Sequence, residues 1–157
     1  MLIQALTGAH KRKTFDCGRA ELNDWLQRIA RQHQERNISK TFVAVDDATQ
    51  STIYGYYALT VAEMDSTQLP HAAQKRMPRR IPGVRLGRLA VDQNVQGKRL
   101  GELLLVDAIE RTKRLQTHAG AIGLFVDAID ESAANFYVRI GFGPSPENPL
   151  MLFLPVG

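Results

Sequence analysis

The sequence predicts a mixed α/β fold whose sheet contains a right-handed β-α-β crossover at its centre. Two short segments have the length of strands: residues 121–128 are a nearly continuous apolar run, and in residues 84–91 the apolar side chains of Val84, Leu86, Leu89 and Val91 alternate poorly, which suggests burial on both faces. Between them, residues 99–115 carry apolar side chains at helical spacing. A strand, a helix and a strand in this order are typical of two adjacent parallel strands joined by a helix. We expect a single domain over residues 1–157, a length that suffices for a hydrophobic core.

The N-terminal part predicts one helix followed by a hairpin. Over residues 21–34, five apolar side chains recur at helical spacing and predict one amphipathic helix: Leu22, Trp25, Leu26, Ile29 and Ala30. Residues 40–47 alternate like a half-buried strand, and the sequence DDATQS at their end is typical of a turn. Residues 52–64 are rich in β-branched and aromatic side chains, so we expect a second strand that pairs with the first.

The positions of proline and glycine and the spacing of apolar residues predict the remaining helices, loop and strand. We expect a short helix over residues 69–77 and a loop over residues 77–83. In the crossover helix we expect six inward side chains: Leu100, Leu103, Leu104, Ala108, Ile109 and Leu115. Residues 131–142 predict a helix that ends at Gly141, a common C-terminal stop, and residues 150–155 predict the last strand.

Composition excludes several classes of protein. Hydrophobic residues make up 44% and charged residues 23% of the chain, as in soluble globular proteins, and no apolar run reaches the roughly 20 residues of a membrane span. The N-terminal residues place apolar side chains before charges, which is not a signal peptide's order. The single cysteine, Cys17, excludes an internal disulfide and favours a reducing cytosol, so we expect a cytoplasmic protein with no membrane association. Four scattered histidines give neither a partner for a cysteine nucleophile nor metal-ligand spacing; we predict no metal and an inert packing role for Cys17.

Positive charge is concentrated between residues 75 and 99. The formal net charge is +4, and eight of the 20 Lys and Arg residues fall in this segment, against one acid, Asp92. The eight basic residues are Lys75, Arg76, Arg79, Arg80, Arg85, Arg88, Lys98 and Arg99. Such a cluster is either a solvated basic face or a surface for polyphosphate or nucleic acid, and composition does not choose between them.

The loop QGKRLG, residues 96–101, precedes the predicted crossover helix and contains two glycines. The first N–H groups of a helix lack intrahelical partners, and the helix dipole favours an anion there. Glycine lets the backbone approach a phosphate closely. The loop matches neither the GxGxxG dinucleotide motif nor a nucleoside triphosphate loop, and by itself it fits a tight structural turn equally well.

The loop is not alone: LGRLAVDQNVQGKRLGELLL and ANFYVRIGF resemble the GNAT superfamily of acetyl-coenzyme A-dependent acetyltransferases. The resemblance implies the GNAT fold, a mixed, mostly antiparallel sheet with a central parallel β-α-β unit and helices on both faces. It also implies that the loop binds the cofactor pyrophosphate. Gln96 and Gly101 match the first and last positions of the family's motif, whereas Arg99 replaces its middle glycine and Gly97 stands two residues earlier. We expect Arg99 to keep its backbone contact and to reach a phosphate with its guanidinium.

The resemblance implies an acetyl-CoA site on the strand before the loop, the loop itself and the later helix. Its residues are Leu89, Ala90, Val91, Gln96, Gly97, Lys98, Arg99, Leu100, Gly101 and Asn135. Asn135 fits a plain helix surface about as well. The N–H of Val91 is expected to stabilise the oxyanion, and Tyr137 stands where the family places its general acid. A half-buried tyrosine that merely packs is the alternative for Tyr137.

More of the chain is similar to one subgroup, the acetyltransferase toxins of bacterial type II toxin–antitoxin modules. The matching stretches include FDCGRAELNDWL, TFVAV, YGYYALT and LFVDAIDESAANFYVRIGF. The resemblance implies transfer of an acetyl group to the α-amino group of aminoacyl-tRNA, which blocks translation. No Asp or Glu presents itself as a base, and an α-amine with a pKa of about 7.7–8.0 needs none at neutral pH. The candidate tRNA-binding residues are Arg76, Arg79, Arg80, Arg85 and Arg88.

The toxin resemblance also implies partners. These are a ribbon-helix-helix antitoxin, operator DNA bound only through the antitoxin complex, and a second copy of the chain in a homodimer. Two other functions stay open. One is an N-acetyltransferase of small amines or protein N-termini, which explains the basic segment poorly because cationic amines prefer acidic clefts. The other is a basic nucleic-acid-binding module that does not bind acetyl-CoA.

Overall fold

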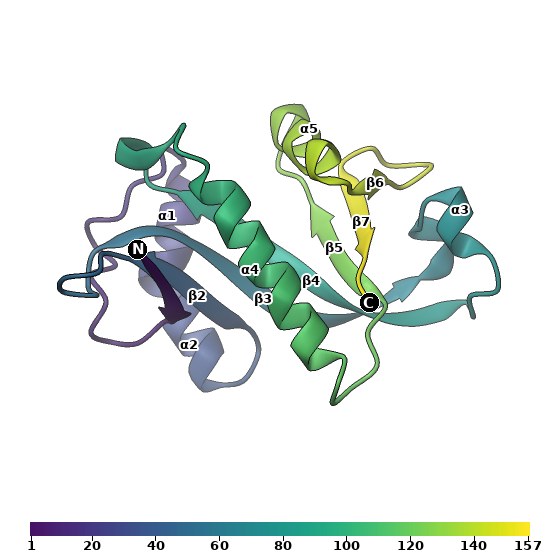
Figure 1. Ribbon diagram of the computed structural model, residues 1–157, viewed down its shortest axis with the longest axis horizontal. Helices are drawn as coiled ribbons and strands as arrows, with labels where there is room; N and C mark the ends of the chain where they lie inside the picture. Colours follow the sequence, from purple (N-terminus) through teal and green to yellow (C-terminus); the bar gives the residue numbers. More distant parts are fainter. The chain divides into compact units, whose positions relative to one another are not determined.

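The computed structural model describes residues 1–157, which form seven strands and five α-helices (Figure 1). The strands are β1 (Leu2–Ala5), β2 (Lys40–Val45), β3 (Ile53–Asp65), β4 (Arg80–Val91), β5 (Gly123–Asp127), β6 (Gly143–Pro144) and β7 (Met151–Pro155). The α-helices are α1 (Ala20–Arg28), α2 (Ala30–Glu35), α3 (His71–Gln74), α4 (Leu100–Leu115) and α5 (Glu131–Ile140), and the 3₁₀ turns are η1 (Ser66–Gln68) and η2 (Gln93–Val95). None of these helices has both the length and the apolar character needed to cross a membrane.

The strands form one sheet in the order β1-β2-β3-β4-β5-β7-β6. β2 is antiparallel to both β1 and β3, and β7 is antiparallel to both β5 and β6. β4 and β5 run parallel, with Leu86 opposite Val126. Because α4 lies between β4 and β5 in the chain, the predicted parallel β-α-β unit at the centre of a mixed sheet is confirmed.

The chain divides into two compact units. The first contains Met1–Thr60 and Gly87–Ala108, and the second contains Val61–Leu86 and Ile109–Gly157. β3, β4 and α4 each contribute residues to both units.

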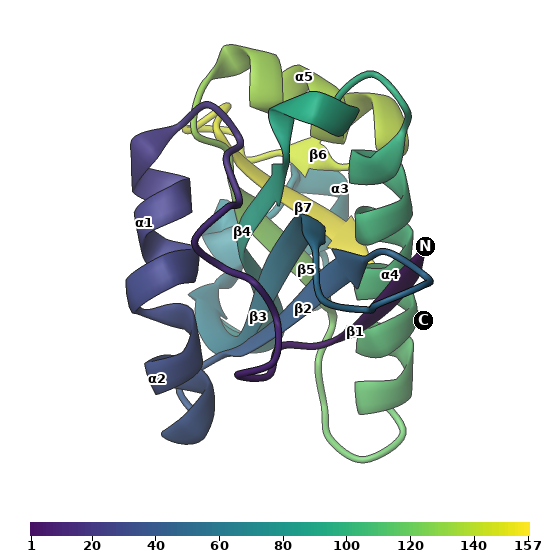
Figure 2. The ribbon, with the colours of Figure 1, turned by 90° about the vertical axis from the view of Figure 1, so that its left-hand side faces the viewer.

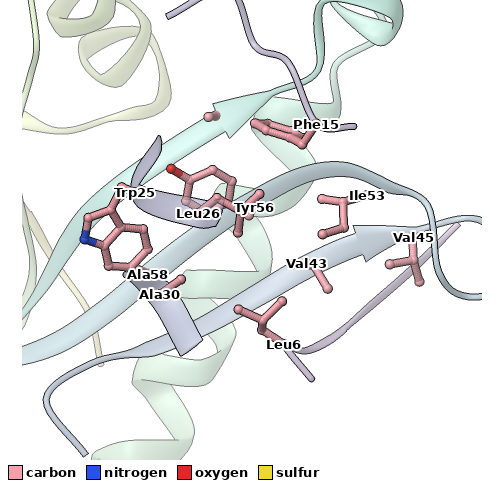
Figure 3. Packing of buried hydrophobic residues seen from close by; sticks show 11 residues of the cluster. Leu6, Phe15, Trp25, Leu26, Ala30, Val43, Val45, Ile53, Tyr56 and Ala58 are labelled. Carbon is pink, nitrogen blue, oxygen red and sulfur yellow. The ribbon is translucent and has the colours of Figure 1, made fainter. Parts of the chain in front are cut away.

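In the first unit, helices cover both faces of the sheet (Figure 2). α1 and α2 lie on one face, over a buried cluster shown in Figure 3: Leu6, Phe15, Trp25, Leu26, Ala30, Val43, Val45, Ile53, Tyr56, Ala58 and Ala90. The first half of α4 lies on the other face. Gly55 allows this close approach, because a Cβ added there would lie 2.9 Å from a methyl carbon of Leu104. The predicted helices on both faces are therefore present around the strands that lead to the crossover.

The second unit has its own buried apolar cluster: Met64, Leu69, Ile81, Phe125, Met151 and Phe153. The rings of Phe125 and Phe153 lie with centroids 4.8 Å apart across β5 and β7. Gly83 in β4 leaves room for the first of these rings, since a Cβ at that position would lie 2.1 Å from Phe125 Cε2.

The prediction of one helix over residues 21–34 is wrong, because the chain forms two. α1 ends at Arg28 and α2 begins at Ala30, with Ile29 between them at φ −116°. Ile29 is 37% exposed and does not continue the buried stripe, whereas Ala30 is fully buried. A β-branched side chain is disfavoured in a helix interior, and the break at Ile29 lets Ala30 face the core.

The predicted loop over residues 77–83 is also wrong, because β4 already begins at Arg80. Proline and glycine signalled a loop, but burial of Ile81 to 1% exposure overrides them. The Pro82 carbonyl accepts a hydrogen bond from the N–H of Ile122 at 3.0 Å, a role that needs no N–H on proline.

The structure also differs from the predictions in which side chains of α4 face inward and in several short elements. Leu103 is 57% exposed, so its predicted inward position is wrong, while Leu105 is fully buried instead. The helix expected over residues 69–77 is shortened to α3. β1 and β6 were not predicted, because four and two residues carry too little periodicity to indicate a strand.

Gly83→Ala should destabilise the protein by about 1–3 kcal/mol, because the new methyl group forces the ring of Phe125 or its strand to move. Gly120→Ala is the matched control, since a Cβ there would have no heavy atom within 4 Å. Chemical denaturation followed by circular dichroism measures both. Equal stability of the two variants would contradict the close packing described for β4 and β5.

Candidate active site

The loop between β4 and α4 has the arrangement that the sequence predicts. β4 ends at Val91, η2 turns the chain, and α4 begins at Leu100. Residues 96–99 are exposed, whereas Leu100 is buried. The first backbone N–H groups of α4 therefore face the loop without intrahelical partners, and they carry the positive end of the helix dipole.

Two residues of this loop have left-handed backbone conformations. Gly97 has φ +83° and Arg99 has φ +62°. A Cβ added at Gly97 would meet nothing within 4 Å, so backbone conformation rather than lack of space favours glycine there. Arg99 adopts a conformation natural to glycine although it carries a side chain, at a cost of about 1–2 kcal/mol. The replacement of the motif's middle glycine therefore leaves the glycine-like backbone in place.

Charge around the loop favours an anion. Lys98 and Arg99 are exposed, and Glu102 is the acid in the first turn of α4. The local charge is therefore positive on a surface that also presents unpaired helix N–H groups.

The side chain of Gln96 binds the protein itself. Its Nε2 donates to the carbonyl of Val91 at 2.9 Å and to the carbonyl of Cys17 at 3.2 Å. Gln96 thus joins the loop to the last residue of β4 and to Cys17. These contacts leave its backbone, rather than its side-chain amide, as the part suited to a phosphate.

Sequence reasoning missed two acids beside this loop, Asp16 and Asp92. Asp92 is buried at 7% exposure and accepts the backbone N–H of Asp16 at 3.1 Å. The one sequence signal was an acid directly after a buried strand, which ordinary turns also show. The contact joins segments 76 residues apart, so local patterns could not reveal it.

An arginine of the basic segment stacks on an aromatic pair in the first unit. The guanidinium carbon of Arg88 lies 4.4 Å from the ring centroid of Trp25. Trp25 in turn stacks on Tyr56, with centroids 6.0 Å apart and an interplanar angle of 11° (Figure 3). The Tyr56 hydroxyl donates to the Leu22 carbonyl at 2.7 Å, and burial raises the pKa of this phenol. Since the Arg88 N–H groups donate to no protein atom, they form a fixed set of donors on an aromatic support.

Tyr137 lies on α5 in the second unit and is 6% exposed. Its ring makes edge contacts with Phe136 and Phe142, at centroid distances of 5.2 and 5.3 Å. Burial raises the pKa of its phenol, so the group stays protonated at neutral pH. Asp130 caps α5 by accepting the N–H of Ala133 at 2.9 Å, which fixes the start of the helix.

The other arginines predicted to bind tRNA lie in the second unit. Arg85 pairs with Asp127 and contacts the Met64 sulfur, so its guanidinium has a structural role in the second unit. Arg79 and Arg80 approach carboxylates of β3 at 3.4 and 3.9 Å, but 85% and 68% of their side chains are exposed. Exposed pairs of this kind contribute little and leave the guanidinium groups accessible. Arg76 lies after α3 with φ +65°.

The remaining polar groups show no second reactive centre. Burial raises the pKa of the Cys17 thiol, and its S–H donates to the Arg19 carbonyl, so the thiolate is disfavoured. No three His, Cys, Asp or Glu side chains are grouped so that they could hold a metal ion.

The structure brings the predicted loop residues and the end of β4 together in the first unit. Leu89 and Val91 are half-buried there, whereas Ala90 belongs to the buried cluster under α1. Tyr137 and Asn135 belong to the second unit, with Asn135 exposed on α5.

Comparison with known proteins places this geometry in a family. The acetyltransferase (GNAT) domain family matches residues 21–150. A tRNA-acetylating toxin of Mycobacterium tuberculosis is 34% identical over 141 residues, which cover 90% of this chain and 83% of that protein.

Solved structures show the same fold. AtaT complexed with acetyl-methionyl-tRNAfMet has a TM-score of 0.91 at 31% identity, over 98% of this chain and 94% of AtaT. A tyrosine-to-phenylalanine mutant of AtaT, bound to acetyl-CoA and the C-terminus of the antitoxin AtaR, has a TM-score of 0.84 at 30% identity, over 98% and 92% of the chains. The KacTA–DNA complex has a TM-score of 0.83 at 30% identity, with the same coverage. The chain therefore belongs to the acetyltransferase (GNAT) family, among the relatives of its tRNA-acetylating toxins.

Proposed function

We propose that this protein is a toxin that transfers the acetyl group of acetyl-CoA to the α-amino group of aminoacyl-tRNA and so blocks translation. The observation that carries the proposal is the likeness, over 98% of the chain, to AtaT complexed with acetyl-methionyl-tRNAfMet. The 34% identity to a tRNA-acetylating toxin supports the same reaction. A substrate that serves translation also agrees with a cytoplasmic protein that has one reduced cysteine.

Acetyl-CoA fits the loop before α4. The pyrophosphate would accept hydrogen bonds from backbone N–H groups of residues 97–101, where the helix dipole and two exposed cations favour an anion. The left-handed conformations of Gly97 and Arg99 are of the kind that anion-binding loops use to bring successive N–H groups together. The edge of β4 at Leu89, Ala90 and Val91 would pair with the pantetheine arm, and Asn135 would bind the same arm.

In the proposed reaction, the neutral α-amine attacks the thioester carbon and the C–S bond then breaks. The Val91 N–H donates to the carbonyl oxygen while that oxygen carries negative charge; such a donor contributes about 2.7–4 kcal/mol to lowering a barrier. The new amide nitrogen loses one proton to water, and the departing sulfur gains one. The products are the acetylated aminoacyl-tRNA and the free thiol of CoA.

Tyr137 is the proposed source of the proton for sulfur. A phenol with an ordinary pKa near 10 is a weaker acid than a thiol near 8.5, so full transfer costs at least about 2 kcal/mol. Burial raises the pKa of Tyr137 further. We therefore assign it a hydrogen bond that strengthens as charge collects on sulfur, with the proton following and water restoring the phenol.

The α-amine needs no general base. With a pKa of about 7.7–8.0 it is partly neutral at pH 7, whereas a lysine amine near 10.4 is almost wholly protonated. This difference favours an aminoacyl group over a protein side chain as the acceptor.

The basic segment provides the surface for the acceptor end of tRNA. Arg76, Arg79, Arg80 and Arg85 supply charge for phosphates, and the accessible guanidinium groups of Arg79 and Arg80 fit that role best. Arg88 differs from them, because its planar group is held on Trp25 with every N–H available. Arg88 is therefore suited to donate hydrogen bonds to one defined group of the substrate, whereas the other arginines attract phosphates by charge.

The proposed partners follow the solved neighbours. AtaT is bound to the antitoxin AtaR, and KacTA is bound to DNA. We extend these partners to a cognate ribbon-helix-helix antitoxin, to operator DNA contacted through the antitoxin complex, and to a homodimer of this chain.

The purified protein should transfer labelled acetyl from acetyl-CoA to charged tRNA, and the label should be recovered on the amino acid. Tyr137→Phe should lower kcat about 10²–10⁴-fold, as loss of a general acid does, because the ring and its packing remain while the proton donor is lost. Tyr54→Phe, on β3, is the control for removal of a phenolic hydroxyl. Transfer of the label to tRNA that carries no amino acid would contradict the proposal. Normal turnover by a folded Tyr137→Phe enzyme would contradict the role of Tyr137.

Arg99→Gly and Arg99→Ala separate the backbone of the loop from its side chain. Both variants lose the guanidinium and should weaken acetyl-CoA binding about tenfold, measured by calorimetry. Arg99→Gly alone relieves the left-handed strain and should gain about 1 kcal/mol of stability. Arg76→Gly, at another left-handed arginine, should gain stability without changing this affinity. Unchanged affinity in Arg99→Ala would remove the proposed phosphate contact.

Arg88→Lys keeps the charge but loses the planar donors stacked on Trp25. We expect KM for charged tRNA to rise about tenfold while KM for acetyl-CoA stays within about twofold. Arg114→Lys, in the last turn of α4, is the control for the same exchange on an exposed surface. Equal KM values for tRNA in both variants would mean that Arg88 contributes only its positive charge and not directed hydrogen-bond donors.

A further inference from the structure

The buried carboxylate of Asp92 connects the loop before α4 to a distant segment of the chain. Its Oδ1 accepts the N–H of Asn94 at 2.9 Å, which closes the local turn η2. Its Oδ2 accepts the N–H of Asp16 at 3.1 Å, which lies 76 residues earlier. Each oxygen of this acid is thus used by a different backbone donor.

Three further hydrogen bonds join the same two segments. The Gln93 N–H donates to the Asp16 carbonyl at 2.9 Å, and Gln93 Nε2 donates to Asp16 Oδ2 at 3.1 Å. Gln96 Nε2 donates to the Cys17 carbonyl at 3.2 Å. The chain between β4 and α4 is therefore attached to residues 16–17 at positions 92, 93 and 96. We call these four hydrogen bonds the 16–92 junction.

The far side of the junction is fixed by α1. Asn23 Oδ1 accepts the N–H of Cys17 at 2.9 Å, and Asn23 Nδ2 donates to Asp16 Oδ1 at 3.0 Å. The N–H of Gly18 also donates to Asp16 Oδ1, at 2.8 Å. Hydrogen bonds from Gly18 and then from Asn23 lower the pKa of Asp16, so it is ionised at neutral pH and accepts all of these donors.

Apart from the junction, the base of the loop is held by the Asp92 N–H, which donates to the Tyr54 carbonyl at 2.8 Å, and by Gln96 Nε2, which donates to the Val91 carbonyl at 2.9 Å. Packing gives the exposed part of the loop no comparable support. Residues 96–99 are exposed, a side chain at Gly97 would touch nothing, and Arg99 holds a strained conformation. Packing therefore does not set the directions of the loop N–H groups, and hydrogen bonds at the base of the loop must do so. A loop that is ordered before binding loses less conformational entropy when it takes up its ligand.

We propose that Asp92 is a positioning residue that, through the 16–92 junction, holds the loop before α4 in the conformation that binds the pyrophosphate of acetyl-CoA. The inference rests on the proposed function and adds a residue to it. Asp92 need not touch the cofactor. It acts on the chain that leads from Val91 to the N-terminus of α4.

Asp92→Asn tests this role with a minimal change. An amide has one acceptor oxygen, so its NH₂ group must face either the Asn94 or the Asp16 N–H, and one hydrogen bond is lost. Asp65→Asn is a matched control, because Asp65 caps the 3₁₀ turn η1 in the same way, accepting the Thr67 N–H at 2.9 Å, but binds no distant backbone N–H. Asn23→Ala weakens the junction from α1 without changing the loop.

We expect Asp92→Asn to weaken acetyl-CoA binding about tenfold or more in calorimetry, and Asn23→Ala to weaken it severalfold. Asp65→Asn should stay within about twofold of wild type. KM for acetyl-CoA should rise in Asp92→Asn while kcat at saturation changes less than about threefold. A merely structural role would instead lower the folded fraction and the apparent kcat, and leave the affinity of the folded protein unchanged.

Two outcomes are decisive and distinct. If the wild-type protein binds acetyl-CoA and a folded Asp92→Asn variant binds it with the same affinity, this inference alone is overturned. Wild-type protein that does not bind acetyl-CoA would overturn the proposed function and the inference with it.

Discussion

The structure depends on one constraint at the start of α4: the first N–H groups of this helix have no partner within the helix. Burial of Leu100 and Leu104 fixes the helix against the sheet, and the loop before it is exposed with two left-handed residues. These N–H groups therefore remain available to a ligand, and the helix dipole makes that ligand an anion. In the sequence, the other proposed cofactor-binding and catalytic residues lie before the start of α4, at positions 89–91, and after it, at Asn135 and Tyr137.

Two kinds of positive charge serve two parts of the proposed reaction. At the loop, backbone N–H groups and two cations suit a compact diphosphate. Along the basic segment, exposed guanidinium groups suit the extended backbone of an RNA, and the stacked Arg88 offers directed donors. The same excess of positive charge disfavours a small cationic amine as acceptor. The positive surface of the protein and the reactivity of an α-amine at neutral pH thus both favour an α-amine carried by RNA as the acceptor.

The sequence predicted what short-range patterns determine and missed what distant contacts determine. The crossover followed from two apolar runs flanking an amphipathic helix, and the loop followed from Gln96 and Gly101. Two errors came from local signals that packing overrides, namely the loop expected at Pro82 and the helix expected to continue through Ile29. The contact between Asp16 and Asp92 joins residues 76 apart, and no periodicity or turn signal encodes it. The left-handed backbone of Arg99 also escaped prediction, because arginine is uncommon in that conformation.

A crystal structure of the protein with acetyl-CoA would show directly whether the loop before α4 binds the diphosphate. We expect the diphosphate within hydrogen-bond distance of backbone N–H groups of residues 97–101, with Arg99 still left-handed and the carboxylate of Asp92 still bound to the Asp16 N–H. A diphosphate bound elsewhere on the protein, with the loop before α4 free of ligand, would contradict this expectation.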